Sequence, residues 1–200
     1  MDRRQALKLS LLAGAGIATN HAAHAAQCEG DGTPMQFVPK TAPDPKANEN
    51  DIAKYGKCPY CGMDRNKFHH SRMLIQYSDD LADGTCSIHC AAISLSLNVD
   101  RDPKALWVGD NAAPGEVKPL VEVDKAWFLV GSKIPGVMTA NSKVAYGGED
   151  AAKAAQAAQG GEIVRFDQAL LAAYTDMSKD VSRIRRNRAE RRRKAMEQKG

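Results

Sequence analysis

Hydrophobic residues in the first half of the chain fall into three segments with different patterns. The segment RMLIQYSDD (72–80) has the composition of a strand followed by an acidic turn. The nearly all-apolar segment SIHCAAISLSL (87–97) predicts a helix, and ALWVGD (105–110) predicts a further strand. This half is therefore expected to form a strand, a helix and a strand in that order.

The second half repeats this order and adds a helix. Two strands, an alanine-rich helix ended by two glycines and a third strand are predicted for AWFLVGS (126–132), KVAYGG (143–148), EDAAKAAQAAQ (149–159) and EIVRF (162–166). The segment DQALLAAYTDM (167–177) predicts a last helix. The expected fold class is α+β, with two similar halves followed by a helical tail.

The start of the chain has the features of an export signal. Residues 1–25 combine a basic start, an apolar stretch over 7–18 and the small-x-small run AHA at 23–25, which predicts cleavage after about Ala25. Arg3 and Arg4 resemble a twin-arginine signal, which exports proteins already folded; an ordinary secretory signal is the alternative. The expected location is the periplasm. After residue 30 no run of 18 apolar residues occurs, so no bilayer span is predicted.

The basic charge of the chain is concentrated in its tail. Residues 183–199 hold nine basic and two acidic residues, a net +7 against +4 for the whole chain, so the remainder carries −3. A solvated helical extension is the plainer interpretation. The alternative is contact with an acidic membrane surface or an acidic partner, since each basic residue near a lipid surface contributes about 1 kcal/mol. Export argues against nucleic acid as a partner.

The five cysteines separate into a lone residue and two close pairs, namely Cys28, Cys58/Cys61 and Cys86/Cys90. An oxidising periplasm favours disulfides, but the odd count and the paired spacing favour one four-cysteine unit. A lipid anchor at Cys28 is not favoured, because Gln27 precedes it where a small residue is normal.

The two pairs have the spacing of a metal site. Cys58 and Cys61 suit a knuckle-like turn, for which Gly62 is well placed, and residues four apart such as Cys86 and Cys90 share one face of a helix. Four sulfurs could thus reach a single ion. If each pair formed a disulfide, no free thiol would remain to bind the ion.

Two methionines are further candidate ligands. Thioether and thiolate are soft donors that suit Cu(I), although most methionines fill cores. Met63 stands two residues from Cys61, and Met138 lies far along the chain. The weaker candidates are three histidines: His69, His70 and His89.

Cys-Pro-Tyr-Cys also resembles the redox motif of glutaredoxin-like proteins. In that scheme an apolar strand precedes the motif and a helix begins at it. Residues 48–57 are not an apolar strand, and Gly62 opposes a helix that starts at Cys58. The scheme also gives no role to Cys86 and Cys90. A thiol oxidoreductase that uses Cys58 and Cys61 therefore remains a lesser alternative.

Six motifs together resemble the NosL-type copper-binding accessory proteins of nitrous oxide reductase maturation. Their order and spacing hold over about 57–170, and they are CGM (61–63), YSDDLADGTCSIHC (77–90), LWVGD (106–110), VDKAWFLVGS (123–132), PGVM (135–138) and GGEIVRFDQAL (160–170).

This resemblance implies two related strand-strand-helix-strand units, Cu(I) as the ligand and copper delivery in the periplasm. Met63 and Met138 match the methionines of the family, and Cys61 matches its glycine-adjacent cysteine. The pair Cys86/Cys90 departs from the pattern and is similar to small heavy-metal-binding cysteine modules. The arginine-rich tail is not a family feature either.

The organisation predicted from these observations is an export signal (1–25), a flexible leader (26–56), a metal-binding unit (57–118), a second α+β unit (119–175) and a basic tail (176–200). We expect an exported, non-enzymatic metallochaperone that binds Cu(I). Its partner would be a copper-receiving enzyme, such as nitrous oxide reductase, or the assembly proteins of that enzyme. The predicted ligands are a subset of the two cysteine pairs with a methionine: Cys58, Cys61, Cys86, Cys90, Met63 and Met138. A structural zinc site of four cysteines is the main alternative.

Overall fold

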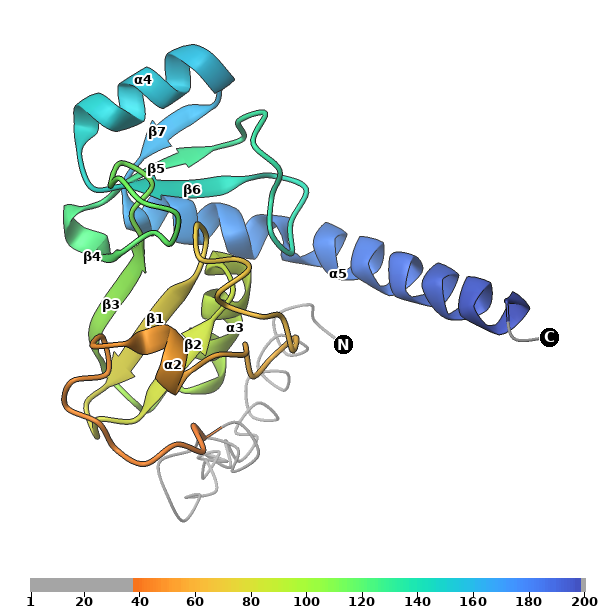
Figure 1. The fold of residues 1–200 in the computed structure, drawn as a ribbon, viewed down its shortest axis with the longest axis horizontal. Coiled ribbons are helices and arrows are strands. Elements are labelled where there is room, and N and C mark those ends of the chain that lie inside the picture. The colour runs from red at the N-terminus through yellow and green to blue at the C-terminus, as the bar shows by residue number, and fades with distance from the viewer. Residues whose placement is uncertain (1–37, 199–200) are drawn as a thin grey trace, which may run out of the picture. The chain divides into compact units, whose positions relative to one another are not determined.

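A computed structural model describes residues 38–198 (Figure 1). The predicted export signal and Cys28 lie outside the described residues.

The first sheet has four strands, and one helix follows its second strand. A short helix, α2 (Asp51–Lys54), precedes the sheet. The elements are β1 (Met73–Tyr77), β2 (Ala82–Thr85), α3 (Ile88–Leu97), β3 (Pro103–Gly109) and β4 (Leu120–Glu122). The strands lie in the order β2-β1-β3-β4, and every neighbouring pair is antiparallel.

The second sheet repeats the arrangement with three strands. After a 3₁₀ turn, η2 (Val123–Lys125), come β5 (Trp127–Val130), β6 (Lys143–Tyr146), α4 (Glu149–Gln159) and β7 (Glu162–Val164). The order is β6-β5-β7, so in each sheet the first strand of the unit pairs with the second on one side and with the third on the other. The predicted α+β class with two strand-strand-helix-strand units is confirmed.

Strand β2 could not be recognised from its residues, because in ADGT only Thr85 is of the β-branched or aromatic types typical of strands. It forms because it pairs with β1 along its whole length, from Met73 opposite Thr85 to Gln76 opposite Ala82. Gly84 is required by close packing: a Cβ there would lie 2.5 Å from the Tyr55 Cβ. The segment before β1 therefore sits directly on this strand.

One hydrophobic core runs through both sheets. Alternate residues of β1 point to opposite faces, so Met73, Ile75 and Tyr77 face α3 and α5, while Leu74 packs against Ala47 and Tyr55. The larger cluster joins residues of both units: Met73, Ile75, Tyr77, Ile88, Ala91, Ala92, Val108, Val123, Ala126, Phe128, Ala145, Val164, Ala169 and Ala173. The two units are therefore packed on a shared core.

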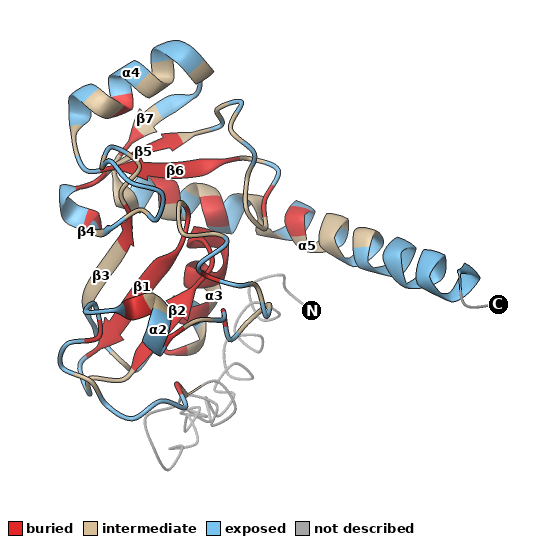
Figure 2. Cartoon of the chain, in the orientation of Figure 1, coloured by how far each residue is buried: buried red, intermediate tan, exposed pale blue. Residues whose placement is uncertain are grey.

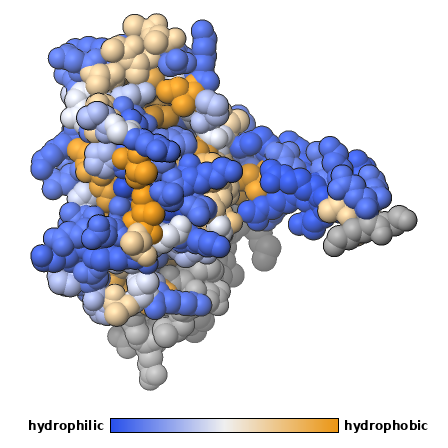
Figure 3. All heavy atoms as spheres, in the orientation of Figure 1, coloured by the Kyte–Doolittle hydropathy of each residue, from blue (hydrophilic) through white to orange (hydrophobic). Residues whose placement is uncertain are grey.

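Helix α5 (Phe166–Glu197) is 32 residues long and changes character along its length. Its first part packs on the core, where Phe166 lies against Phe128 and the Tyr174 hydroxyl donates to the Ala92 carbonyl. Asp180 is the last buried residue of the helix. Beyond it the helix becomes exposed and strongly hydrophilic (Figures 2 and 3). Within residues 38–198 no helix is long and apolar enough to cross a membrane.

Candidate metal centre

The four cysteines of the two pairs come together in one cluster. The sulfur atoms of Cys58, Cys61, Cys86 and Cys90 all lie within 4.8 Å of one another. The Sγ atoms of Cys61 and Cys86 are 3.4 Å apart, and those of Cys86 and Cys90 are 3.8 Å apart. All four thiols are free, and only that of Cys61 is partly exposed.

The first pair is held by a tight turn, the knuckle (residues 57–64). The Cys58 N–H donates to the Met63 carbonyl at 2.9 Å, and the Gly62 N–H donates to the Cys58 carbonyl at 2.9 Å. Gly62 has φ of +77°, a conformation that glycine adopts without a steric penalty. The turn therefore directs both sulfurs to one side.

The second pair stands at the junction between β2 and α3. Cys86 directly follows β2, and Cys90 lies in the first turn of α3. The Ser71 hydroxyl donates to the Cys86 carbonyl at 2.8 Å, which fixes the backbone ahead of the helix. Helix periodicity alone does not bring these sulfurs together, because α3 begins after Cys86.

A fully buried arginine joins the knuckle to the sheet. Arg65 is 0% exposed and donates to the carbonyls of Tyr55, Met73 and Thr85, at 2.6, 3.1 and 3.2 Å. These carbonyls belong to the segment before the knuckle, to β1 and to β2. Because Thr85 adjoins Cys86, the same side chain ties the knuckle to the second cysteine pair.

The charge of Arg65 is balanced by Asp51 at the start of α2. Asp51 Oδ2 lies 2.7 Å from an Arg65 guanidinium nitrogen and 2.9 Å from Arg72 Nε, and its Oδ1 accepts from Arg72 at 3.0 Å. All three side chains are buried. One carboxylate thus serves two buried guanidinium groups, one of which belongs to the arginine that ties the knuckle to the second cysteine pair.

The sulfurs influence one another's protonation. Hydrogen bonds from Cys61, Cys86 and Cys90 lower the pKa of Cys58, because three S–H donors stabilise its thiolate. Donation to Cys58 raises the pKa of Cys86 and of Cys90, and burial acts in the same direction. The metal-free cluster therefore favours a thiolate at Cys58 with protons kept on Cys86 and Cys90, and a bound cation would replace those protons.

The spacing of the sulfurs fits a single metal ion. A tetrahedron with metal–sulfur bonds of about 2.3 Å has edges of about 3.8 Å. Two of the pairs, at 3.4 and 3.8 Å, are close to this edge, and all pairs stay within 4.8 Å. Sulfur donors select soft or borderline ions, of which Cu(I) and Zn²⁺ are the main candidates.

Both predicted methionines pack against this cluster. Met63 and Met138 contact it together with Tyr60 and Val137, and all four are partly exposed. Met138 has φ of +63°, in the left-handed region that a residue with a long side chain rarely adopts. Such a conformation costs of order 1–3 kcal/mol and persists only when its surroundings impose it.

The surroundings of Met138 come from α5. The Ala140 N–H donates to Asp180 Oδ1 at 3.0 Å, and the Asn141 amide donates to Asp176 Oδ2 at 2.7 Å. Asp176 also accepts from Lys143 at 2.8 Å. The loop that presents Met138 is therefore anchored to the last helix.

The model of the NosL family matches residues 49–173, which is more than half of the chain. The chain belongs to the NosL family. The matched range contains the knuckle, both cysteine pairs and both methionines.

Two solved structures are similar to this NosL-family chain. The copper chaperone NosL from Shewanella denitrificans is 23% identical over 64% of this chain and 92% of that chain, with a TM-score of 0.47. The apo-NosL protein from Achromobacter cycloclastes is 22% identical over 48% of this chain and 82% of that chain, with a TM-score of 0.34. No curated protein matches the chain.

The three candidate histidines are not part of the four-cysteine cluster. His89 Nδ1 lies 3.7 Å from Asp180 Oδ2, and both side chains are buried. His69 Nδ1 accepts from the Lys118 N–H at 3.2 Å, and the His70 ring packs edge-on against that of His69. Among the His, Cys, Asp and Glu side chains of residues 38–198, the four cysteines alone form a group that could hold an ion.

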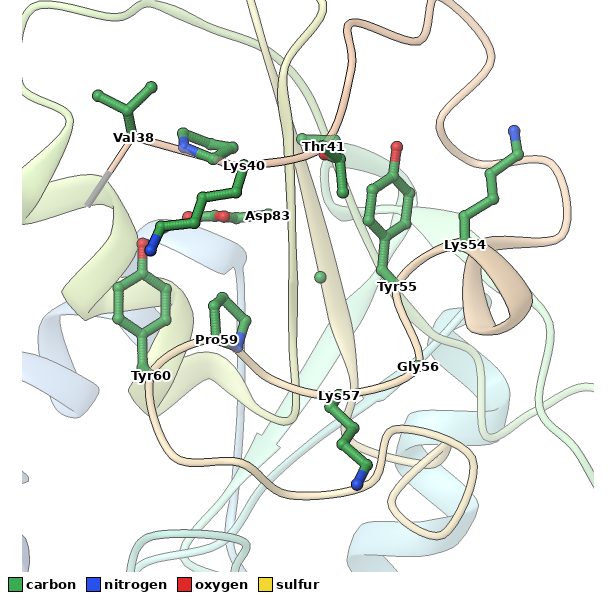
Figure 4. A pocket seen from close by; sticks show the side chains of 13 residues that line it. Val38, Lys40, Thr41, Lys54, Tyr55, Gly56, Lys57, Pro59, Tyr60 and Asp83 are labelled. Carbon is green, nitrogen blue, oxygen red and sulfur yellow. Dashed lines mark hydrogen bonds between the residues drawn. The ribbon is translucent and has the colours of Figure 1, made fainter. Parts of the chain in front are cut away.

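A cavity of about 570 Å³ lies on the knuckle but contains no sulfur (Figure 4). Its wall includes Tyr60, whose hydroxyl donates to the Asp83 carboxylate, and Asp83 accepts a second hydrogen bond from Ser94 at 2.7 Å. Burial raises the pKa of Tyr60 and that of Asp83. The full lining is Val38, Pro39, Lys40, Thr41, Lys54, Tyr55, Gly56, Lys57, Pro59, Tyr60, Ala82, Asp83 and Gly84.

The buried charged residues that hold the segments carrying the cysteines were not identified from the sequence. Asp51, Arg65 and Arg72 are buried and paired, yet their residue types are those of an exposed surface. They are separated by 14 and 7 residues, and no spacing rule links them. A single sequence offers no signal that distinguishes them from the exposed charges nearby.

Proposed function

We propose that the protein is a copper chaperone that holds Cu(I) in the four-cysteine cluster. The observation that carries this proposal is the gathering of four sulfurs within 4.8 Å, with two methionines packed against them. Soft thiolate and thioether donors prefer Cu(I) to harder ions. Membership of the NosL family supports the same assignment.

Transfer would proceed by ligand exchange and not by enzymatic catalysis. Cys58, Cys86 and Cys90 are buried, whereas Cys61, Met63 and Met138 are partly exposed. A sulfur of the receiving protein can therefore approach only at this second group. The incoming sulfur would bind the copper ion before one of the sulfur ligands of the chaperone leaves. Copper is then never released into water, and its oxidation state does not change.

The proposed setting is the periplasm. The support comes from the sequence of residues 1–25, which has the features of an export signal. The proposed recipient is a copper enzyme, such as nitrous oxide reductase, or its assembly proteins. In an oxidising compartment the sulfur pairs could close into disulfides, so either loading before export or a local reductant would have to keep them reduced.

The test is a Cu(I) titration of the reduced protein, without oxygen, against a chromogenic Cu(I) chelator. A Cys61→Ser, Cys90→Ser double variant should lose tight copper retention. Cys28→Ser, which alters the cysteine outside the two pairs, is the matched control and should bind as the parent protein does. If the double variant retains the parent affinity, the proposal is wrong.

A structural zinc site is the second candidate, and the closed four-sulfur geometry favours it. Four cysteine sulfurs within reach of one ion, three of them buried, are typical of structural zinc. Structural zinc supplies roughly 10 kcal/mol or more of apparent folding free energy, so a chelator should unfold such a protein. A copper carrier should stay folded when empty. Circular dichroism before and after chelation separates the two functions.

Thiol oxidoreduction is disfavoured by burial. A nucleophilic thiolate has to reach the sulfur of a disulfide substrate, and Cys58, one of the two thiols whose pKa is lowered, is only 2% exposed. Cys61 is more accessible, but its sulfur lies only 3.4 Å from that of Cys86. A sustained turnover of disulfide substrates by the metal-free protein would reverse this judgement.

A further inference from the structure

The exposed end of α5, the basic arm (residues 181–197), has no role in the metal centre. Within α5 the buried residues are Ala169, Ala173 and Asp180, all of which precede the arm. The arm extends for about 25 Å at the rise of an α-helix. It carries two acidic residues against eight basic ones: Arg183, Arg185, Arg186, Arg188, Arg191, Arg192, Arg193 and Lys194. In the space-filling view most of it is hydrophilic (Figure 3).

The charges of the arm are poorly balanced within the helix itself. Residues three or four apart are neighbours on a helix surface, and like charges at that spacing destabilise it. Arg188 has Arg185, Arg191 and Arg192 at these spacings. An ion pair joins Arg193 to Glu197, and another joins Arg183 to Asp180 at the base of the arm. An anionic surface beside the arm would relieve the remaining repulsion.

The distribution of side chains on the arm indicates which kind of surface fits. At 100° per residue the basic positions fall on all sides of the helix, so no apolar stripe exists for insertion into a bilayer. Met196 is the large exposed hydrophobic residue of the arm. Anchor residues of protein interfaces, arginine included, lie in well-packed pockets from which water is excluded, and single-stranded nucleic acids stack on aromatic side chains. The arm has no aromatic residue and no apolar stripe to surround its arginines. A layer of anionic lipid head groups requires only charge.

We propose that the basic arm binds the surface of an anionic phospholipid membrane, electrostatically and without insertion. About half of the basic side chains can face a flat surface at once. The Asp180 carboxylate at the base of the arm also accepts the Ala140 N–H of the loop that presents Met138. Docking of the arm therefore fixes the orientation of the cysteine cluster relative to the membrane, a consequence that rests on the proposed copper function.

The test is co-sedimentation of the full chain with vesicles of phosphatidylglycerol and phosphatidylethanolamine, with phosphatidylcholine vesicles as the neutral reference. We expect binding to the anionic vesicles alone, and loss of that binding as salt rises from about 0.1 to about 1 M and shortens the screening length to roughly 3 Å. Each basic residue near the surface strengthens partitioning about fivefold. A variant with four neighbouring arginines replaced by glutamine should therefore bind several hundred-fold more weakly: Arg185→Gln, Arg188→Gln, Arg191→Gln and Arg192→Gln.

A matched variant removes the same number of charges from the body of the protein. Four exposed lysines are replaced by glutamine, and vesicle binding should stay within about fivefold of the parent, the effect of one residue: Lys46→Gln, Lys67→Gln, Lys125→Gln and Lys153→Gln. Glutamine is a good helix former, so circular dichroism should show an intact α5 in the arm variant. Equal losses in the two variants, or no binding to anionic vesicles at low salt, would overturn the proposal.

Two further measurements separate this proposal from other partners and from the copper function. Tighter binding to polyglutamate or to single-stranded DNA than to anionic vesicles would assign the arm to a different partner and overturn the membrane proposal. The arm variant should retain the Cu(I) affinity of the parent. The Cys61→Ser, Cys90→Ser variant should retain vesicle binding, so each proposal can fail without the other.

Discussion

The buried charges beneath the cysteine cluster lead to a sharp prediction about stability. Replacing Asp51 by asparagine keeps the size of the side chain but removes its charge. The carboxylate now accepts three hydrogen bonds from guanidinium groups, at 2.7, 2.9 and 3.0 Å. The Arg65 and Arg72 side chains, which are 0% and 3% exposed, would be left without a counter-ion.

The expected cost follows from that burial. Breaking a buried ion pair on one side destabilises a protein by about 3–5 kcal/mol, because the remaining charge is desolvated without compensation. Typical domains are stable by only about 5–15 kcal/mol, so the Asp51→Asn variant should lose a large part of its folding free energy. Urea denaturation of the reduced, metal-free protein, followed by circular dichroism, measures the loss.

A nearby exposed ion pair provides the control. Lys54 lies 2.7 Å from Asp44, and both side chains are partly in water, at 35% and 26% exposure. Lys54→Met should cost at most about 1 kcal/mol, because surface ion pairs contribute little. A loss of less than about 1 kcal/mol in Asp51→Asn, equal to that of the control, would refute the idea that this carboxylate stabilises the segment beneath the cysteines.

Three further predictions concern the metal centre and its surroundings. Met138→Leu preserves side-chain volume and should cost less than about 1.5 kcal/mol in unfolding free energy, but it should weaken Cu(I) binding in the chelator titration; unchanged affinity would show that Met138 only packs. Gly62→Ala and Gly115→Ala both place a side chain at positive φ in open space and should each lose about 1–2 kcal/mol in urea denaturation, yet only the former should also lower metal affinity. Burial and the neighbouring His69 lower the pKa of His70 in the folded protein. The unfolded chain therefore binds a proton more readily, and the free energy of unfolding should decline as the pH falls below about 6.5, by at most about 1.4 kcal/mol per pH unit. His70→Gln should flatten this decline in a pH series of denaturation curves, and an identical slope in parent and variant would contradict it.

Elements with a strong local pattern could be predicted closely from the sequence. The alanine-rich segment 149–159 forms α4 with the expected bounds, since two acidic residues open it and the chain leaves it through Gly160, at φ of +68°. The apolar segment 87–97 forms α3, of which Ile88 and the next four residues are apolar or buried. In these segments local preference and tertiary burial agree, so pattern alone is sufficient.

Elements that depend on partners could not be predicted in this way. Strand β2 exists because β1 lies beside it, and α2 lies in the stretch expected to be a leader, where Asp51 is fixed by arginines 14 and 21 residues further on. The helix predicted over 167–177 and the predicted helical tail form one continuous helix that ends at Glu197, because nothing in the sequence between them breaks it. Tertiary pairing overrides weak local signals in the first two cases.

In the candidate metal centre, too, some features follow from local sequence and others depend on tertiary contacts. The grouping of the cysteines follows from spacing that is readable in the sequence, because each pair needs only one local turn. Met138 lies 75 residues beyond Met63, so no local pattern connects them. Its place among the candidates depends on the softness of its thioether and on the family resemblance. Its proximity to the cluster depends on the β5–β6 loop and on the carboxylates of α5.

The core that both sheets share limits how the protein can give up an ion. Residues from β1, α3, β5 and α5 belong to the same buried cluster, so separating the halves would expose apolar surface on both of them. The two units should consequently melt in a single cooperative transition, with equal calorimetric and van't Hoff enthalpies. Separating one unit from the other to release a bound metal ion would cost as much free energy as unfolding the whole protein. Exchange therefore has to occur by side-chain rearrangement at the partly exposed edge of the cluster, while the rest of the molecule stays intact.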